Sequence, residues 1–185
     1  YIPYHTIRIT SAGEYLFRLL PANSSATAAP WGQALLTLDG GTHYTLLLSG
    51  SADAPQFTLL QDDTTPLEAG RSRIAVIAAD PQAQPATVSL DSGGPVAANL
   101  AYGQQSAPAI VPMGRDTLRV NIGDQTIDEI EIDLAEARLY TFIITTPTNA
   151  GEAPQISQYE TEVPGLAYLR IIQAVEPELG PVDFC

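Results

Sequence analysis

The sequence is built from short runs in which apolar and polar residues alternate, separated by clusters of turn-forming residues. Strands about 8–12 residues apart with turn signals between them are typical of an all-β sandwich or barrel. The turn clusters include Asp39–Gly41, Asp91–Pro95 and Pro147–Gly151. Only Ile127–Leu139 offers a helical window, and strand is preferred there because Ile130 and Ile132 alternate with acidic residues.

An internal repeat accompanies this pattern, because several segments recur in the same order about one hundred positions later. The matching segments share few identical residues, but they keep the same order and a nearly constant spacing, which supports a repeat. A unit of about 100 residues is the size of an immunoglobulin-like sandwich. The matching pairs are Tyr44–Leu48 with Tyr140–Ile144, Pro55–Phe57 with Pro154–Ile156, Ile74–Pro81 with Arg170–Pro177 at an offset of 96, and Gly13 with Gly114.

The repeat predicts an all-β chain of tandem immunoglobulin-like β-sandwich repeats with an unusual division. Residues 1–70 form a partial repeat that lacks its opening strands, and residues 71–165 form a complete repeat. Residues 166–185 then carry the opening strands of a further repeat. The piece missing at the front and the surplus piece at the back are therefore of the same kind.

Two segments, Ser72–Pro81 and Ala167–Ala174, share an opening pattern in which arginine and apolar residues precede a small residue. They resemble the opening strand of a family of bacterial extracellular repeats called domain of unknown function 4397. Pro181–Phe184 resembles the second strand of that family, and Asn99–Gly103 resembles a later segment.

The resemblance implies immunoglobulin-like sandwiches in surface or secreted proteins, and it implies no established chemistry. A histidine that is usual in the family's opening strand is replaced by Ala78 in one copy and by Gln173 in the other. Any role of that histidine is therefore absent from this chain.

The charge balance excludes several partners. The net charge is −13, and all eight basic residues are arginine. An acidic chain without a basic patch repels phosphate backbones and anionic membranes, so we expect no nucleic-acid binding. No apolar run approaches the roughly 18 residues that a membrane-spanning helix needs, so we expect no membrane span. A lone cysteine, Cys185, makes no internal disulfide and is a candidate for an intermolecular thiol contact.

The segment Asp91–Val96 contains the most specific catalytic motif, because Asp-Ser-Gly-Gly-Pro resembles the nucleophile segment of chymotrypsin-like serine proteases. That chemistry needs a histidine base held by an aspartate. The chain has only His5 and His43, and neither lies in the setting that this family uses. We therefore predict a hairpin turn here and no catalytic residue, with a serine hydrolase at Ser92 as a remote alternative.

Acidic residues raise the question of a metal site. The side chains of Glu129, Glu131 and Asp133 share one strand face and spread over about 13 Å, which indicates a solvated face and not a cage. Asp62 and Asp63 form a better loop candidate for Ca²⁺, but they lack the spacing of a known calcium loop. Two histidines without a cysteine pattern also argue against a transition metal, so we predict no metal and no cofactor.

The terminal segments suggest a function. A sandwich without early strands exposes its core and an unpaired edge. The tail of one subunit would supply these strands to the next, which builds a head-to-tail filament by β-strand addition. The alternative is a segment of a longer array whose neighbouring repeats complete both ends. The predicted donated residues are Tyr168, Leu169, Ile171, Ile172, Ala174, Val182 and Phe184.

The sequence thus predicts an extracellular structural protein, the subunit or repeat of a surface filament, stalk or layer, and not an enzyme. Its partners would be copies of itself or neighbouring repeats. An adhesin or carbohydrate-binding module is the alternative, with loop residues around Trp31 and Asp62–Asp63 as its site. Aromatic residues at alternate positions are more often sheet packing than a sugar platform.

Overall fold

A computed structural model of the chain describes residues 4–8, 11–51, 53–79, 85–145, 155–162, 168–173 and 182–184. All regular structure in these ranges is β-strand, which confirms the predicted all-β class. None of the described segments is a helix with the length and apolar character needed to cross a membrane.

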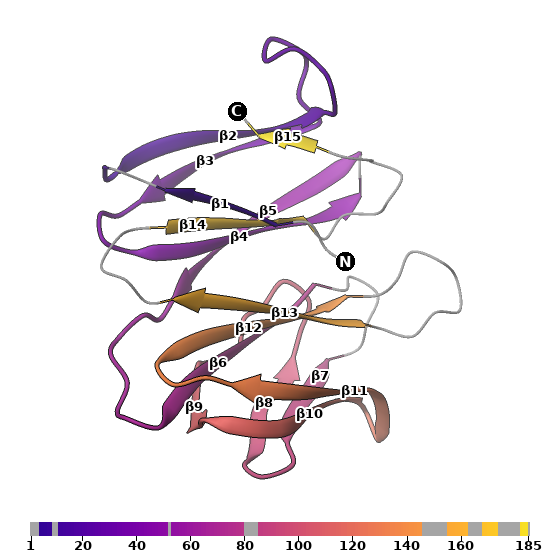
Figure 1. Cartoon of the computed structure of the whole chain (residues 1–185). Helices are drawn as coiled ribbons and strands as arrows, with labels where there is room; N and C mark the ends of the chain where they lie inside the picture. Colours follow the sequence, from indigo (N-terminus) through magenta and orange to yellow (C-terminus); the bar gives the residue numbers. More distant parts are fainter. Residues whose placement is uncertain are drawn as a thin grey trace. The chain divides into compact units, whose positions relative to one another are not determined.

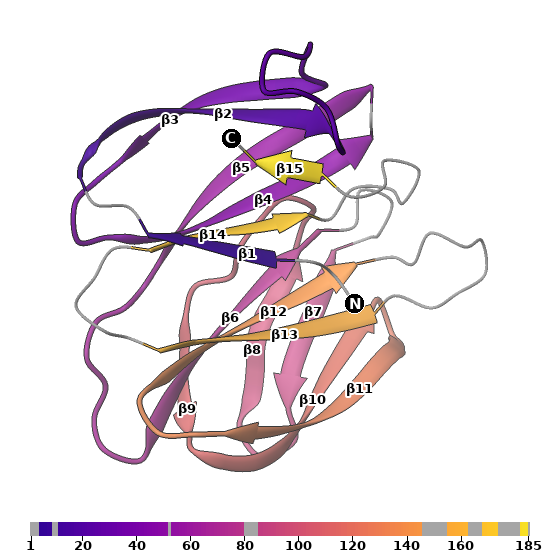
Figure 2. The same ribbon diagram turned by 45° about the horizontal axis from the view of Figure 1, so that its top comes forward.

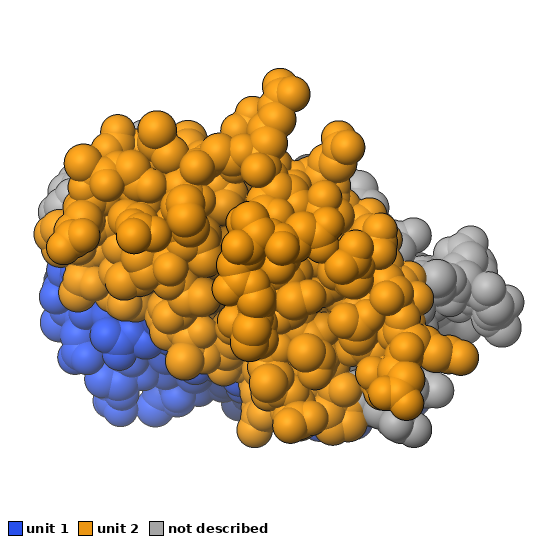
Figure 3. All heavy atoms as spheres, turned by 90° about the horizontal axis from the view of Figure 1, so that it is seen from below, with its two compact units in different colours: residues 1–62, 165–185 blue, residues 63–164 orange. Residues whose placement is uncertain are grey.

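The chain divides into two compact units (Figure 3). Unit 1 comprises residues 1–62 together with 165–185, and unit 2 comprises residues 63–164. The first boundary therefore falls after Asp62, where the sequence predicted one near Gly70. The C-terminal segment is not a separate third piece in this structure, because it belongs to unit 1.

Unit 2 consists of two four-stranded sheets (Figure 1). One sheet has the order β13-β12-β6-β9 and the other has the order β11-β10-β7-β8. Their apolar residues form one core cluster in which Val76, Leu118 and Phe142 are fully buried. The strands are β6 (Arg71–Ala78), β7 (Ala86–Leu90), β8 (Gly94–Leu100), β9 (Ala109–Pro112), β10 (Gly114–Ile122), β11 (Gln125–Leu134), β12 (Arg138–Thr145) and β13 (Gln155–Glu162).

Unit 1 consists of a four-stranded sheet, β1-β14-β4-β5, and a three-stranded sheet, β15-β2-β3. Its core contains the fully buried Leu19, Leu46 and Leu48 together with Ile171. The strands are β1 (Tyr4–Arg8), β2 (Gly13–Pro21), β3 (Gly32–Leu38), β4 (His43–Ser51), β5 (Ala54–Asp62), β14 (Tyr168–Gln173) and β15 (Val182–Phe184).

The two units share one pattern of strand pairing (Figures 1 and 2). In unit 2, β6 lies between β9 and β12, antiparallel to the first and parallel to the second. In unit 1, β14 lies between β1 and β4 with the same two orientations. Likewise β7 pairs antiparallel with β10, and β15 pairs antiparallel with β2. The last two strands of the chain therefore occupy the places that β6 and β7 occupy in unit 2.

The register of the central strands corrects one detail of the sequence comparison. Tyr140 pairs with Ile74 in unit 2, and the matching Tyr44 pairs with Leu169 in unit 1. The equivalent of Ile74 is therefore Leu169, so the offset of 96 that aligned Ile74 with Arg170 is wrong by one residue. A slip of one residue would turn every side chain to the other face. The corrected offset of 95 matches Val76 with Ile171, and both are buried core residues.

The repeated tyrosines explain why the segments around Tyr44 and Tyr140 look alike. The backbone N–H of Asp39 donates to the Tyr44 hydroxyl at 3.3 Å, and the N–H of Ala135 donates to the Tyr140 hydroxyl at 2.8 Å. In each unit the tyrosine therefore ties the start of a central strand to the turn five residues earlier. The Tyr44 hydroxyl also donates to the Asp39 carboxylate at 3.2 Å.

The placement of Ile171 yields a stability prediction for unit 1. Ile171→Ala should lower the free energy of unfolding by about 2–4 kcal/mol, because it removes a side chain that is 1% exposed in the core. Urea titration followed by the fluorescence of Trp31, the single tryptophan, reports on this unit. The matched control is Leu35→Ala, which removes a side chain that is 61% exposed and should change stability by less than about 0.5 kcal/mol. Equal effects of the two substitutions would contradict the assigned packing.

Candidate functional site

The candidate assembly site is the place of β14 within the four-stranded sheet of unit 1. Its backbone pairs on both sides, from Tyr168 to Ile172 with β1 and from Leu169 to Gln173 with β4. Ile171 is the member of this strand whose side chain is described, and it packs in the same core cluster as Leu46. A strand held on both edges and through its core face is an integral part of the sheet.

β15 adds a shorter contact at the edge of β2. Val182 pairs with Pro21, and Phe184 pairs with Leu19. Of the residues predicted to be donated between subunits, Tyr168, Leu169, Ile171 and Ile172 lie on β14, and Val182 and Phe184 lie on β15. Ala174 and the predicted thiol of Cys185 lie outside the described residues. The structure thus brings these strands to unit 1 of their own chain, and donation to a second chain stays a prediction.

Ser92 lies in the turn between β7 and β8, which confirms the predicted hairpin. Leu90 pairs with Gly94 across this turn. The Ser92 hydroxyl donates to a carboxylate oxygen of Asp116, and the Ser92 N–H donates to the other oxygen at 3.3 Å. Burial pushes the pKa of Asp116 up, but hydrogen bonds from Ser92, Thr117 and Asp91 outweigh that effect and hold it below its ordinary value. An ionised carboxylate that accepts from the serine anchors the turn to β10.

The acidic residues of β11 form an exposed face. Glu129, Glu131 and Asp133 are exposed, while Ile132 and Leu134 are buried, which confirms the predicted alternation. Arg119 on β10 donates to Glu129 at 2.6 Å and pairs with Asp91 at 2.8 Å. The hydrogen bond to Glu129 and the two carboxylate charges raise the pKa of Arg119. Among the described residues, no group of three His, Cys, Asp or Glu side chains is arranged to hold a metal ion.

The two aspartates proposed for calcium interact with protein groups. Asp62 is buried and accepts hydrogen bonds at 3.1 Å from the hydroxyl of Thr45. Asp63 accepts from the N–H of Thr65 at 3.0 Å and from its hydroxyl at 2.8 Å, in a short turn that follows β5. These bonds give both carboxylates a structural role in unit 1 and in the loop after β5.

Arg73 is a structural residue that the sequence analysis did not single out. It is 2% exposed, and its guanidinium donates to the carbonyl oxygens of Asp63 at 2.8 Å and Thr65 at 2.9 Å. It also donates to the Thr65 hydroxyl at 2.7 Å and pairs with the Asp63 carboxylate at 3.2 Å. A buried arginine requires such partners. The sequence did contain a signal for this role, because Arg73 stands inside an apolar run ten residues after the polar Asp-Thr-Thr loop.

The ion pair shifts the titration of Asp63. Burial raises the pKa of this carboxylate, but the two hydrogen bonds from Thr65 and the charge of Arg73 together hold it below its ordinary value of 3.8. The ionised form is therefore the one that the fold stabilises.

Trp31 does not stand out as a sugar platform. Trp31 is partly buried and packs against the core cluster of unit 1, as Phe57 and Leu36 also do. The backbone N–H of Trp31 donates to the carbonyl oxygen of Leu19 at 2.8 Å, which continues the pairing of β2 with β3. Packing, the more frequent role of aromatic residues on a sheet, accounts for its position.

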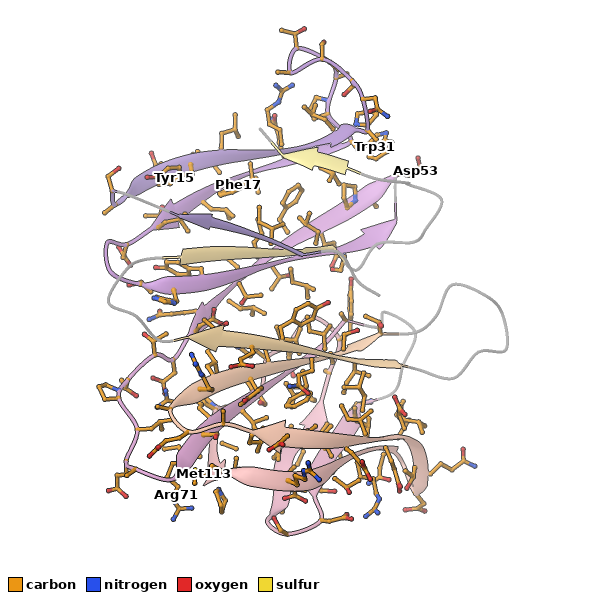
Figure 4. All side chains as sticks on the ribbon, viewed as in Figure 1. Tyr15, Phe17, Trp31, Asp53, Arg71 and Met113 are labelled. Atoms are coloured by element: carbon orange, nitrogen blue, oxygen red, sulfur yellow. The ribbon has the colours of Figure 1, made fainter. Side chains whose placement is uncertain are left out.

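One surface hollow of about 370 Å³ lies in unit 2. It is lined by Pro66, Leu67, Glu68, Arg71 and Ile110. Arg71 and Met113 lie close together in this region (Figure 4), and the Met113 N–H donates to the carbonyl oxygen of Gly70 at 2.9 Å. Among the side chains that the structure describes, no predicted site residue lines this hollow.

Part of the chain matches a protein family. Residues 4–88 match the family described as Domain of unknown function (DUF4397). The match confirms the family resemblance over this stretch, which runs from β1 to β7. No curated protein matches the chain.

The Asp63–Arg73 pair predicts an acid-sensitive contribution to the stability of unit 2. Because the folded-state pKa is lowered, this contribution is present above the ordinary pKa and is lost as the pH falls through the folded-state value. Because the Asp63 side chain is 39% exposed and solvent screens its charge, Asp63→Asn should lower the free energy of unfolding by at most about 1 kcal/mol at pH 7. The variant should also show a smaller fall in stability between about pH 5 and pH 2. Urea titration followed by circular dichroism measures both. The same acid dependence in the variant as in the wild type would rule out this role.

The turn at Ser92 gives a prediction that separates structure from catalysis. A fluorophosphonate probe, which labels activated serines, should not label the protein. Ser92→Ala should lower the free energy of unfolding by about 1 kcal/mol, since it removes the hydrogen bond to Asp116. Labelling of the wild type that is lost in Ser92→Ala would instead establish a nucleophile.

Proposed function

We propose that this chain, whose residues 4–88 match the DUF4397 family, is an extracellular structural protein that assembles through its C-terminal strands. It would be a subunit or repeat of a surface filament, stalk or layer. The observation that carries the proposal is the position of β14, a late segment that completes the sheet of the first unit between β1 and β4.

The mechanism is strand exchange. Unit 1 needs β14 for both its sheet and its core, because Ile171 is 1% exposed in the cluster formed with Leu19 and Leu48. The same contacts form whether the strand comes from the same chain or from a neighbouring copy, so exchange costs little at equilibrium. Exchange of the segment from each chain to the next would give a head-to-tail assembly of β-sandwich repeats.

Composition argues against anionic partners for this assembly. The chain has a net charge of −13, no lysine and one cysteine in 185 residues. A high net charge of one sign favours solubility and opposes binding to anionic surfaces. Ser92, Asp62, Asp63 and Trp31, the residues on which the alternatives depend, interact with other groups of the fold.

A cysteine pair tests whether the C-terminal strand is exchanged. Thr6 on β1 and Arg170 on β14 are direct partners in the sheet. Thr6→Cys with Arg170→Cys, in a Cys185→Ser background, should form a disulfide across this pair on mild oxidation. We expect cross-linked monomers after refolding at low concentration and a ladder of multimers after refolding at high concentration. Non-reducing electrophoresis distinguishes the two products.

Controls make the ladder specific. Thr6→Cys alone in the same background should give at most dimers, because each chain then carries one thiol. Negative-stain electron microscopy of the wild type at the high concentration should show filaments. Cross-linked monomers alone at every concentration, with no filaments, would reject strand exchange and leave the chain as a self-closed module.

A further inference from the structure

The hairpins β2–β3 and β10–β11 occupy corresponding places in the two units, but their turns differ in length. In unit 2 only Gly123 and Asp124 stand between β10 and β11. In unit 1 residues 22–31 separate β2 from β3, and this loop extends beyond the ends of both strands (Figures 1 and 2). Since two residues close the hairpin in unit 2, most of the unit 1 loop is not needed to join its strands.

The β2–β3 loop consists mainly of small and hydroxyl-bearing residues. Residues 22–31 are Ala-Asn-Ser-Ser-Ala-Thr-Ala-Ala-Pro-Trp, and none of them is charged. The large apolar residue among them, Trp31, packs against the core cluster of unit 1. The rest of the loop therefore lacks the arginine and aromatic anchors that carry most of the affinity at protein–protein interfaces.

Hydrogen bonds fasten the second half of the loop to β2. The Arg18 guanidinium donates to the carbonyl oxygens of Ala26 at 2.7 Å and Ala28 at 2.8 Å. The Ala28 N–H donates to the carbonyl oxygen of Ser25 at 2.9 Å, which closes a turn within the loop. The loop is therefore a defined part of unit 1, although its length is not needed by the hairpin.

Asn23 lies in the turn that opens the loop. The Ser24 N–H donates to the carbonyl oxygen of Pro21 at 3.2 Å, and Asn23 has a φ of 60°. Asparagine is one of the few residues other than glycine that adopt this left-handed conformation readily. Asn23 is exposed, whereas the hydroxyl oxygen of Ser24 is buried. The turn therefore leaves Asn23 accessible from solvent.

Asn23 also begins the acceptor pattern for N-linked glycans, which is asparagine, any residue except proline, and then serine or threonine. Ser24 is the middle residue, and Ser25 supplies the hydroxyl group and is exposed. The other three asparagines of the chain are not followed by serine or threonine two positions later. The left-handed turn explains an asparagine here, but it explains neither Ser25 nor the length of the loop.

We propose that Asn23 is the acceptor of an N-linked glycan, with an oligosaccharide on a polyprenyl diphosphate as the donor. The amide nitrogen of Asn23 forms a bond to C1 of the first sugar as the bond between C1 and the diphosphate oxygen breaks. The amide gives up one proton, and polyprenyl diphosphate leaves. The inference rests on the extracellular location in the proposed function, because such glycans are a surface modification of secreted proteins.

The full chain, exported through a eukaryotic secretory pathway behind a signal peptide, tests the acceptor. Intact-mass spectrometry should show an added mass that peptide N-glycosidase removes, leaving an aspartate in place of Asn23. Asn23→Gln and Ser25→Ala should each abolish the added mass. Ser24→Ala is the matched control, because it keeps the acceptor pattern and removes a buried hydroxyl group, and it should retain the glycan. Circular dichroism establishes that the variants keep the β-fold.

A reporter makes a negative result decisive. A second acceptor pattern, joined to the same chain by a flexible linker, shows that the exported protein has met the transferase. An unmodified Asn23 beside a modified reporter would overturn the proposal. Sugar that persists in Asn23→Gln would also overturn it, because it would then be attached to a serine or threonine hydroxyl. The host exports the chain in any case, so a failed cross-linking ladder would reject strand exchange and leave the glycan site standing.

Discussion

The fold of unit 1 depends on one constraint, that a sheet needs its central strand. β14 pairs with β1 on one side and with β4 on the other, and Ile171 reaches the core between the sheets. Without it, β1 would lose the strand with which it pairs and β4 would expose one edge. Since β14 follows β4 by more than one hundred residues, unit 1 is closed by a contact of high sequence separation.

Unit 2 also needs its central strand, but there the strand comes from the same contiguous segment of chain. Its central β6 begins directly after the loop that carries Asp63 and Thr65, and Arg73 fastens the strand to that loop. Four interactions surround the guanidinium, and they fix a buried charge in place. At the corrected offset of 95, the equivalent of Arg73 on β14 is Tyr168. The arginine that fastens β6 to its preceding loop therefore has no arginine counterpart on β14.

The polar residues that looked most like sites are used by the fold. Ser92 and Asp116 secure a hairpin to the neighbouring strand, and Asp62 accepts hydrogen bonds from Thr45. In the proposed assembly, affinity would come from main-chain hydrogen bonds between strands and specificity from alternate side chains. Exchange of β14 would use the main-chain groups of β1 and β4.

The sequence alone determined the all-β class, because period-2 patterning and turn residues act locally. It also determined the alternation of β11, and it predicted that residues 166–185 resemble what the front of the chain lacks. It did not predict β9. The sequence comparison contained two offsets, 96 from Ile74 with Arg170 and 95 from Ala78 with Gln173. Only the tertiary structure decided between them, and only it decided where the segment pairs and which groups Arg73 contacts. The physical reason is that the pairing of distant strands depends on which strand edges and apolar surfaces are still unpaired when the chain is compact. The local sequence pattern of a strand does not contain that information.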